Sequence, residues 1–543
     1  MKVSGNVLLA KAIARGGIDT IFFIMGGPVN DALLAARDAG IRLIDVRHEQ
    51  AAAMMAHAYA RASGKPAVCM GASGPGTINL TTGLANALID CAPVLALGGA
   101  SPLSSAGTEA FQEIDQLSIM RPVTKWADRI LHTRRIPEYV DLALARATMG
   151  KAGPVYLDLP GDVLYGEVEE EEVVWPRPRR MGRSNADPAL VDECIDLLKK
   201  AERPLLLSGS GVLWSDGASE MRAFVDATGI PFYTTPQGRG AVAEDHPFFY
   251  GTARSSAFRE ADLVFVVGTR LSYVFAHGRA PRFADAAKFV MINIEADEIA
   301  RTSRADFGLV GDAAAVLRQL RDAASGKIAP ERYGAWREKL EAIERKKRTE
   351  EGEDSDATPI HPLRLCRELR EFLDRDTILV VDGQEILNYA RRAIPTHVLG
   401  NRLNSGPFGT MGVGLPFGVG AKAARPDAKV VVLHGDGSFG LNAMELDTAV
   451  RHNLPVLVVI SLNGGWTADP DRKKPGRDLG YTRFDRMAEA LGCHGEYVEK
   501  PEDIRGALER GAAAVASGRP AVVNVVTDWR ARADTVKFTA FST

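Results

Sequence analysis

Short runs of apolar and β-branched residues recur along the whole chain and alternate with longer segments of helical pattern. The runs are TIFFIMG, RLIDVR, PAVCMG and PVLALGG in the first third, PLLLSGSG, LVFVVGTR and FVMINIE in the middle, and TILVVDG, KVVVLHGDG, PVLVVISLN and AVVNVVTD in the last third. Nearly continuous apolar strands separated by helices are typical of parallel sheets that are covered on both faces. The pattern therefore predicts three doubly wound α/β domains.

Two charged segments separate these three regions. Residues 166–183 read GEVEEEEVVWPRPRRMGR, and residues 328–358 hold a highly charged helical pattern that ends in EGEDSDATP. Runs of this kind usually mark solvated connectors. We therefore expect domains at 1–165, 185–327 and 358–529, followed by a tail at 530–543. Ligands of such sheets bind at the carboxyl ends of the strands, so the residues that follow each strand are the candidates for a site.

Composition excludes several classes of protein. The 543 residues carry a formal net charge of −3, which gives no sign of a nucleic-acid-binding surface. The cysteines are scattered, odd in number and without a CxxC pair, so neither a disulfide framework nor a zinc site is expected. There is no apolar run of about 18 residues, and the N-terminal segment reads as an amphipathic helix rather than a signal peptide. We expect a cytoplasmic protein without a membrane span.

The clearest chemical signal lies in the last third, where two strands end in polar residues. The first ends in Gly435-Asp436-Gly437-Ser438, and the next ends in Asn463. Glycines at a strand end let backbone N–H groups approach phosphate oxygens, whereas an aspartate alone would repel a phosphate. A divalent cation between the two charges resolves this conflict, and magnesium prefers oxygen ligands. A lone GDG turn is common, but its combination with the asparagine that ends the next strand is more specific.

This segment resembles the coenzyme-binding signature of thiamine-diphosphate enzymes. In that family the aspartate, the asparagine and a backbone carbonyl two residues further on hold magnesium. The resemblance therefore implies a metal site at Asp436, Asn463 and Gly465. Family members often carry two or three asparagines here, whereas this chain has one, at the ligand position. The further coenzyme contacts implied in this segment are Gly437, Ser438 and Trp466.

Two more segments of the last third resemble the same signature. In SGPFGTMGVGLP the resemblance implies that Met411 forces the two rings of the coenzyme into a bent V and that Gly409 offers backbone groups to the aminopyrimidine. From the residues alone, Met411 could equally be a core side chain beside a helix N-terminus. The segment DGQE, which closes the strand TILVV, falls where the family contacts the diphosphate; the residues are Gly383, Gln384 and Glu385.

In the first third, RLIDVRHEQAAAMMAHAYARASGKPAVCMG resembles the pyrimidine-binding domain of these enzymes. Glu49 follows a strand and opens an alanine-rich helix, a position where the helix dipole alone also favours a glutamate. In the family this carboxyl group is hydrogen-bonded to N1′ of the pyrimidine, so the resemblance implies that Glu49 activates the coenzyme. The family pairs this domain with the diphosphate domain of another subunit, which implies a homodimer at least and a homotetramer by analogy.

The loop GTEAFQEIDQ and a segment of the middle third help to choose a branch of the family. Acetolactate synthases and 2-hydroxyacyl-CoA lyases carry a Phe-Gln pair over the coenzyme, which implies catalytic roles for Phe111 and Gln112; as surface-loop residues they would mean little. GTRLSYVFAHGRAPRF is similar to the lyases and to oxalyl-CoA decarboxylases rather than to FAD-binding acetolactate synthases. It implies ADP, or the ADP part of CoA, near Arg270 and Glu295 and not FAD.

The resemblance as a whole implies a 2-hydroxyacyl-CoA lyase with thiamine diphosphate and Mg²⁺ as cofactors. Such an enzyme cleaves a 2-hydroxyacyl-CoA, for instance the short branched 2-hydroxyisobutyryl-CoA, reversibly to formyl-CoA and an aldehyde or ketone through a coenzyme-stabilised carbanion. Oxalyl-CoA decarboxylation uses the same intermediate and stays open, as does an acetolactate synthase-like activity. The tail at 530–543 carries three cations and two aromatic residues, which suits a lid over CoA; disorder is the alternative.

Overall fold

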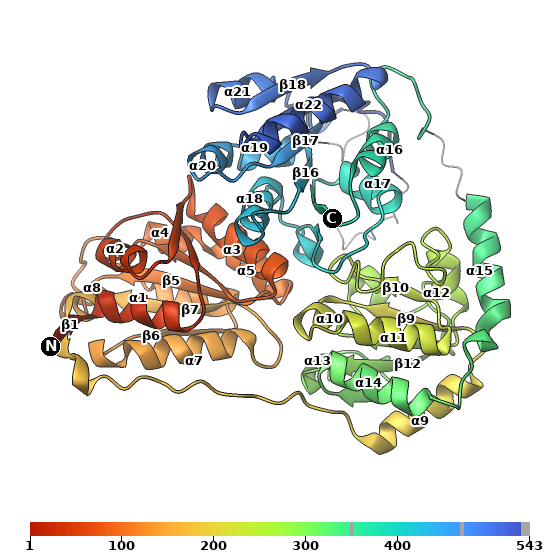
Figure 1. Cartoon of the computed structure of the whole chain (residues 1–543), viewed down its shortest axis with the longest axis horizontal. Coiled ribbons are helices and arrows are strands. Elements are labelled where there is room, and N and C mark those ends of the chain that lie inside the picture. The colour runs from red at the N-terminus through yellow and green to blue at the C-terminus, as the bar shows by residue number, and fades with distance from the viewer. Residues whose placement is uncertain (348–351, 467–471, 534–543) are drawn as a thin grey trace.

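The computed structural model describes residues 1–347, 352–466 and 472–533, which form three α/β domains (Figure 1). Each domain is built on one parallel sheet flanked by helices, which confirms the predicted fold class. An extended segment leads from the N-terminal to the central domain, and α15 (Gly334–Lys347) leads on towards the C-terminal domain. No helix in the described part of the chain is long and apolar enough to cross a membrane. Most of the predicted lid at 530–543 lies outside the described residues.

The N-terminal sheet has the strand order β3-β2-β4-β5-β7-β6. Its strands are β2 (Thr20–Phe23), β3 (Arg42–Asp45), β4 (Ala67–Gly71), β5 (Val94–Ala100), β6 (Trp126–Arg129) and β7 (Val155–Pro160). Its helices are α1 (Gly5–Arg15), α2 (Asn30–Asp38), α3 (Glu49–Ser63), α4 (Pro75–Asn79), α5 (Thr81–Ile89), α6 (Gln116–Met120), α7 (Ile136–Thr148) and α8 (Gly161–Tyr165). A short antiparallel ribbon of β1 (Lys2–Ser4) and β8 (Glu167–Glu169) ties the start of the chain to the end of this domain.

The central sheet has the order β10-β9-β11-β12-β13. The chain adds β10 on one side of β9 and β11 on the other, so the order of strand addition reverses between β9 and β11. Its strands are β9 (Pro204–Ser208), β10 (Phe232–Thr234), β11 (Leu263–Val267), β12 (Lys288–Asn293) and β13 (Phe307–Val310). Its helices are α9 (Pro188–Lys200), α10 (Ser210–Trp214), α11 (Ala218–Thr228), α12 (Arg254–Glu260), α13 (Ala296–Ala300) and α14 (Ala313–Ala324). The reversal is the point at which ligands bind to sheets of this kind.

The C-terminal sheet has the order β15-β14-β16-β17-β19-β18. Its strands are β14 (Ile378–Asp382), β15 (Arg402–Leu403), β16 (Val430–Gly435), β17 (Leu457–Leu462), β18 (His494–Val498) and β19 (Ala521–Val526). Its helices are α16 (Pro362–Phe372), α17 (Glu385–Ala393), α18 (Gly414–Ala424), α19 (Asp436–Leu441), α20 (Glu445–Arg451), α21 (Phe484–Ala490) and α22 (Ile504–Ala516). Because β16 pairs with β17, their carboxyl ends bring the GDG turn and Asn463 to one place.

The N-terminal and C-terminal domains share one hydrophobic core, in which α3 packs against α18 (Figure 1). The approach is close: a Cβ on Gly420 would lie 2.3 Å from the carbonyl oxygen of Met55. The His57 ring meets the edge of Phe417 with 4.8 Å between centroids. Helix α3, which begins at Glu49, is therefore fixed against the helix that follows the Met411 turn.

Candidate coenzyme site and the cavity beside it

Residues at the carboxyl ends of β14, β16 and β17 enclose a small cavity. Ten of the eleven coenzyme residues expected from the sequence line it: Gly383, Gln384, Glu385, Met411, Asp436, Gly437, Ser438, Asn463, Gly465 and Trp466. The remaining one, Gly409, lines a larger adjoining cavity. Three of the residues line both cavities, namely Gly383, Gln384 and Met411. Segments distant in sequence are thus brought together at one edge of the C-terminal sheet.

The side-chain oxygens of Asp436 and Asn463 lie together, because both accept a hydrogen bond from the Gly465 amide, at 2.9 and 3.2 Å. The other carboxylate oxygen of Asp436 accepts the Gly437 amide at 2.9 Å. Burial raises the pKa of Asp436 to about 6. The backbone hydrogen bonds to this carboxylate therefore do not fully offset the cost of burying its negative charge. Carboxylate, amide and carbonyl oxygens are the donors that magnesium prefers. The residues present therefore fit a magnesium ion with a diphosphate.

Close packing makes glycine necessary at two points of this site. A Cβ on Gly465, at φ +152°, would lie 2.1 Å from the carbonyl oxygen of Arg477. A Cβ on Gly437 would lie 2.8 Å from the Trp466 ring. The indole therefore packs directly on the GDG turn and forms one wall of the small cavity.

Two buried side chains support the turn from the strands below it. Nδ1 of His434 lies 3.1 Å from the hydroxyl oxygen of Ser438, and burial lowers the pKa of His434 to about 3, so its ring is neutral. Asp382 accepts the amides of Gly383 and Gly414 at 2.7 and 2.9 Å, and burial raises its pKa to about 6. Sequence reasoning missed His434, although its place directly before the GDG turn was a usable signal.

The N-terminal candidates lie apart from both cavities. Glu49 opens α3 and is 9% exposed, and its carboxylate accepts a hydrogen bond from the Asn79 side chain at 3.0 Å. Phe111 is 86% exposed, and Gln112, at φ +59°, accepts a hydrogen bond from the Ser73 hydroxyl at 2.8 Å. Within the described residues none of the three candidates lines either cavity. One chain alone therefore does not bring Glu49 to the diphosphate residues.

Comparisons with known proteins decide the family. The N-terminal TPP binding domain of thiamine pyrophosphate enzymes matches residues 3–119, the central domain matches 191–320 and the C-terminal TPP binding domain matches 385–525. The chain is 33% identical over 557 residues to a 2-hydroxyacyl-CoA lyase of Arabidopsis thaliana, with 97% of this chain and 96% of the relative covered.

The chain belongs to the thiamine pyrophosphate enzymes.

Two further relatives of similar identity have names that indicate different reactions. A probable acetolactate synthase of Mycobacterium bovis is 34% identical over 537 residues, which cover 96% of this chain and 95% of the relative. The oxalyl-CoA decarboxylase of Escherichia coli is 32% identical over 553 residues, with coverage of 96% and 95%. The predicted family is therefore confirmed: this is a thiamine-diphosphate-dependent carbon–carbon lyase.

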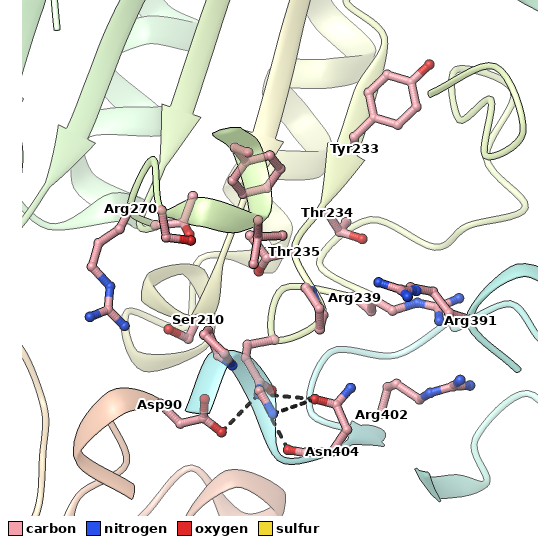
Figure 2. Close-up of a pocket in the computed structure, with 18 of the residues that line it drawn as sticks. Asp90, Ser210, Tyr233, Thr234, Thr235, Arg239, Arg270, Arg391, Arg402 and Asn404 are labelled. Atoms are coloured by element: carbon pink, nitrogen blue, oxygen red, sulfur yellow. Dashed lines mark hydrogen bonds between the residues drawn. The ribbon is translucent and has the colours of Figure 1, made fainter. Parts of the chain in front are cut away.

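The larger cavity of this thiamine pyrophosphate enzyme has a volume of about 3370 Å³ and lies where the three domains meet (Figure 2). Arg270, at the end of β11, lines it and donates a hydrogen bond to the Ile89 carbonyl at 2.5 Å. Glu295, which the sequence assigns to a ribose, does not line it among the described residues. Its carboxylate instead accepts the Lys151 amide at 3.0 Å. The contact is with the N-terminal domain, and Lys151 itself lines the cavity.

Several arginines line the larger cavity, and we call five of them the arginine cluster: Arg239, Arg254 and Arg282 of the central domain and Arg391 and Arg402 of the C-terminal domain. Figure 2 shows Arg239, Arg391 and Arg402 on one side of the pocket and Arg270 on the other. Burial, together with repulsion from neighbouring arginines, lowers the pKa of Arg254 to about 9 and also lowers the pKa values of Arg391 and Arg402.

Few counter-charges face the arginine cluster. Arg239 donates from Nε to the Glu244 carboxylate at 2.7 Å. In contrast, all three guanidinium nitrogens of Arg402 and two of Arg254 are buried and have no hydrogen-bond partner in the described part of the chain. A buried charge without a partner is costly, and an anionic ligand in the cavity would offset that cost. The planar guanidinium group matches phosphate oxygens in particular.

Proposed function

We propose that this enzyme is a 2-hydroxyacyl-CoA lyase, which cleaves a 2-hydroxyacyl-CoA reversibly to formyl-CoA and an aldehyde or ketone. The observation that carries the proposal is the arginine cluster. CoA bears a diphosphate and a 3′-phosphate and so offers several negative charges, whereas a keto acid such as pyruvate offers one. The similarity to the 2-hydroxyacyl-CoA lyase of Arabidopsis thaliana supports the same choice.

In this proposal the small cavity holds the diphosphate of the coenzyme, with magnesium bound by Asp436, Asn463 and the Gly465 carbonyl. When bound, thiamine diphosphate supplies the nucleophilic carbon and takes up the negative charge that bond cleavage leaves. The protein contributes position: Gly437 lets the Trp466 ring pack directly on the turn that would hold the diphosphate.

The phosphates of CoA bind the arginine cluster in the larger cavity, and the thioester end points towards the coenzyme. Gly383, Gln384 and Met411 line both cavities, so they mark the place where substrate and coenzyme meet. ADP stays a prediction for the reversal point of the central sheet, near Arg270. The C-terminal lid also stays a prediction.

Glu49 comes from a second copy of the chain in this proposal. Within one chain it lines neither cavity, yet its carboxyl group must contact the coenzyme to activate it. A homodimer that sets the start of α3 in one subunit against the Met411 turn of the other satisfies both conditions. It also covers two exposed apolar side chains at the carboxyl end of the N-terminal sheet, Met25 at 67% and Phe111 at 86% exposure. We propose a pair of such dimers as a homotetramer.

A thioester assay tests the proposal. The protein, with thiamine diphosphate and Mg²⁺, is given 2-hydroxyisobutyryl-CoA, a straight-chain 2-hydroxyacyl-CoA, oxalyl-CoA, or pyruvate with FAD. We expect formyl-CoA and a carbonyl product from the 2-hydroxyacyl substrates. Formyl-CoA and CO₂ from oxalyl-CoA alone would make the enzyme a decarboxylase. Acetolactate from pyruvate without turnover of any thioester would remove CoA from the proposal altogether.

A further inference from the structure

One glutamine side chain joins all three domains beside the coenzyme site. Gln237 lies on the loop after β10 and is 6% exposed. Its Nε2 donates to the carboxylate of Asp90, in the N-terminal domain, at 2.9 Å and to the side-chain oxygen of Asn404, in the C-terminal domain, at 3.3 Å. The dashed lines that reach Asp90 and Asn404 in Figure 2 mark these bonds. The amide therefore connects a loop of the central domain to both of its neighbours.

Asn404 shapes the turn that leads to Met411. Its side-chain oxygen accepts the Gly406 amide at 2.8 Å. Gly406 has φ +60°, and a Cβ there would lie 2.0 Å from Oδ1 of Asp90, so the turn lies directly against this carboxylate. The turn then passes through Gly409, at φ +73°, to Met411, which lines both cavities. The hydrogen bonds of Gln237 thus fix the start of the segment that carries the proposed coenzyme wedge.

Two side chains of the N-terminal domain face the carboxylate of Asp90. The carboxylate lies 3.6 Å from Nη1 of Arg61 and 3.4 Å from Nε2 of His57, and all three side chains are almost fully buried. Burial lowers the pKa of His57, so its ring is neutral and Arg61 supplies the positive charge. Both residues belong to α3, the helix that begins at Glu49.

The loop of Gln237 also carries part of the arginine cluster. Arg239 follows two residues later, after a tight turn in which the Gly238 amide donates to the Thr235 carbonyl at 3.0 Å. A Cβ on Gly238 would lie 2.5 Å from the Ser208 carbonyl oxygen, so the turn is packed against the end of β9. Gln237 and Arg239 therefore belong to one loop that is packed against the end of β9.

We propose that Gln237 is a positioning residue that sets the Gly406–Met411 turn relative to the arginine cluster. It acts through Asn404, not by contact with the reacting atoms, and aligns the coenzyme with a thioester that is bound by its phosphates. The binding energy of the CoA phosphates, which are remote from the reaction, would then help to hold the reacting carbon of the thioester in position against the coenzyme. The inference rests on the proposed function, because it takes the coenzyme to lie against Met411.

The variant Gln237→Met tests this role, because it keeps the length of the side chain and removes its donor. We expect thiamine diphosphate affinity, measured by calorimetry without substrate, to fall about tenfold. The near-ultraviolet circular dichroism of the bound coenzyme changes, and kcat falls about tenfold while KM for the thioester stays within about twofold. The matched control is Gln319→Met, which removes bonds of 2.9 and 3.1 Å to Ala186 inside the central domain. It should leave the three readouts unchanged.

Asn404→Leu breaks the same chain of hydrogen bonds at its other end. We expect losses at least as large, because the bond from the Gly406 amide is lost as well, and the double variant with Gln237→Met should be no worse than Asn404→Leu alone. If Gln237→Met has the same coenzyme affinity and kcat as the control Gln319→Met, Gln237 has no positioning role, and the lyase proposal is unaffected. If the unaltered protein binds no coenzyme, calorimetry shows this before any substrate is added, and both proposals fail together.

Discussion

The two cavities that meet at Met411 have opposite electrostatic demands. The small one holds an acid, Asp436, whose pKa burial raises to about 6, and it fits a diphosphate only with a cation between them. The larger one holds arginines whose pKa values burial lowers, and it fits a polyanion without a metal. Burial disfavours whichever charge is present, so each cavity calls for a partner of opposite sign. Two phosphate-bearing molecules can therefore bind side by side without competition.

The largest loss of activity should come from a change at Glu49, which lines neither cavity in its own chain. Glu49→Gln removes the carboxyl group that we propose activates the coenzyme, so we expect kcat to fall by roughly 10²- to 10⁴-fold. The calorimetric affinity for CoA should stay within about threefold, because in the proposal Glu49 contacts the coenzyme and not CoA. Unchanged turnover would show that Glu49 is not catalytic.

Asp436→Ala should disable the small cavity alone. Loss of a metal ligand should weaken magnesium-dependent coenzyme binding by at least about 100-fold and leave CoA affinity unchanged. The matched control is Asp447→Ala on neighbouring α20, where the aspartate accepts a hydrogen bond from surface Arg451 at 2.7 Å. Coenzyme affinity that is the same with and without a chelator, in the unaltered protein, would contradict the metal site.

Arg254→Met and Arg402→Met should affect the larger cavity alone. Each should weaken CoA binding about tenfold and leave the affinity for pantetheine, which lacks the phosphates, unchanged. Each should also raise the melting temperature of the ligand-free protein, because a buried charge without a partner is removed. Arg259→Met, at an exposed position of the same helix as Arg254, is the control. Equal losses for CoA and pantetheine would show that the cluster does not bind phosphate.

The smallest effect concerns Asp382, which lines the larger cavity and hydrogen-bonds the Gly383 turn. Its pKa is raised by burial from 3.8 to about 6, so between these values the folded protein keeps a proton that the unfolded chain has released. Stability therefore falls as pH rises through this interval. The free energy of unfolding of the unaltered protein, relative to Asp382→Asn, should fall by roughly 1 kcal/mol between about pH 5 and pH 7. Parallel profiles in denaturant titrations would contradict this assignment.

The candidate diphosphate residues could be grouped from the sequence because their signal is local. Asp436 and Asn463 each end a strand, and the two strands are neighbours in the sheet. Glu49 is equally local, since it opens a helix directly after a strand. The strand β7, in contrast, is missed because VYLDLP is interrupted by an acid and ends in proline, so it lacks a continuous apolar run.

The arginine cluster and the Gln237 contact could not be predicted in this way. Arg254 and Arg402 are ordinary arginines in the sequence, and only the packing of two domains brings them to one cavity. The contact of Glu295 with the N-terminal domain is hidden from the sequence for the same reason. Its place after β12 favours a ribose contact, but Lys151 of another domain takes its carboxylate. Local patterns carry no information about which domain covers a strand end.

The most direct test of the two-cavity arrangement is a calorimetric titration of CoA into protein already saturated with thiamine diphosphate and Mg²⁺. We predict that CoA binds once per chain with the coenzyme still in place, and that this heat is lost when Arg254→Met and Arg402→Met are combined. Displacement of the coenzyme by CoA, or the absence of any CoA binding, would contradict it.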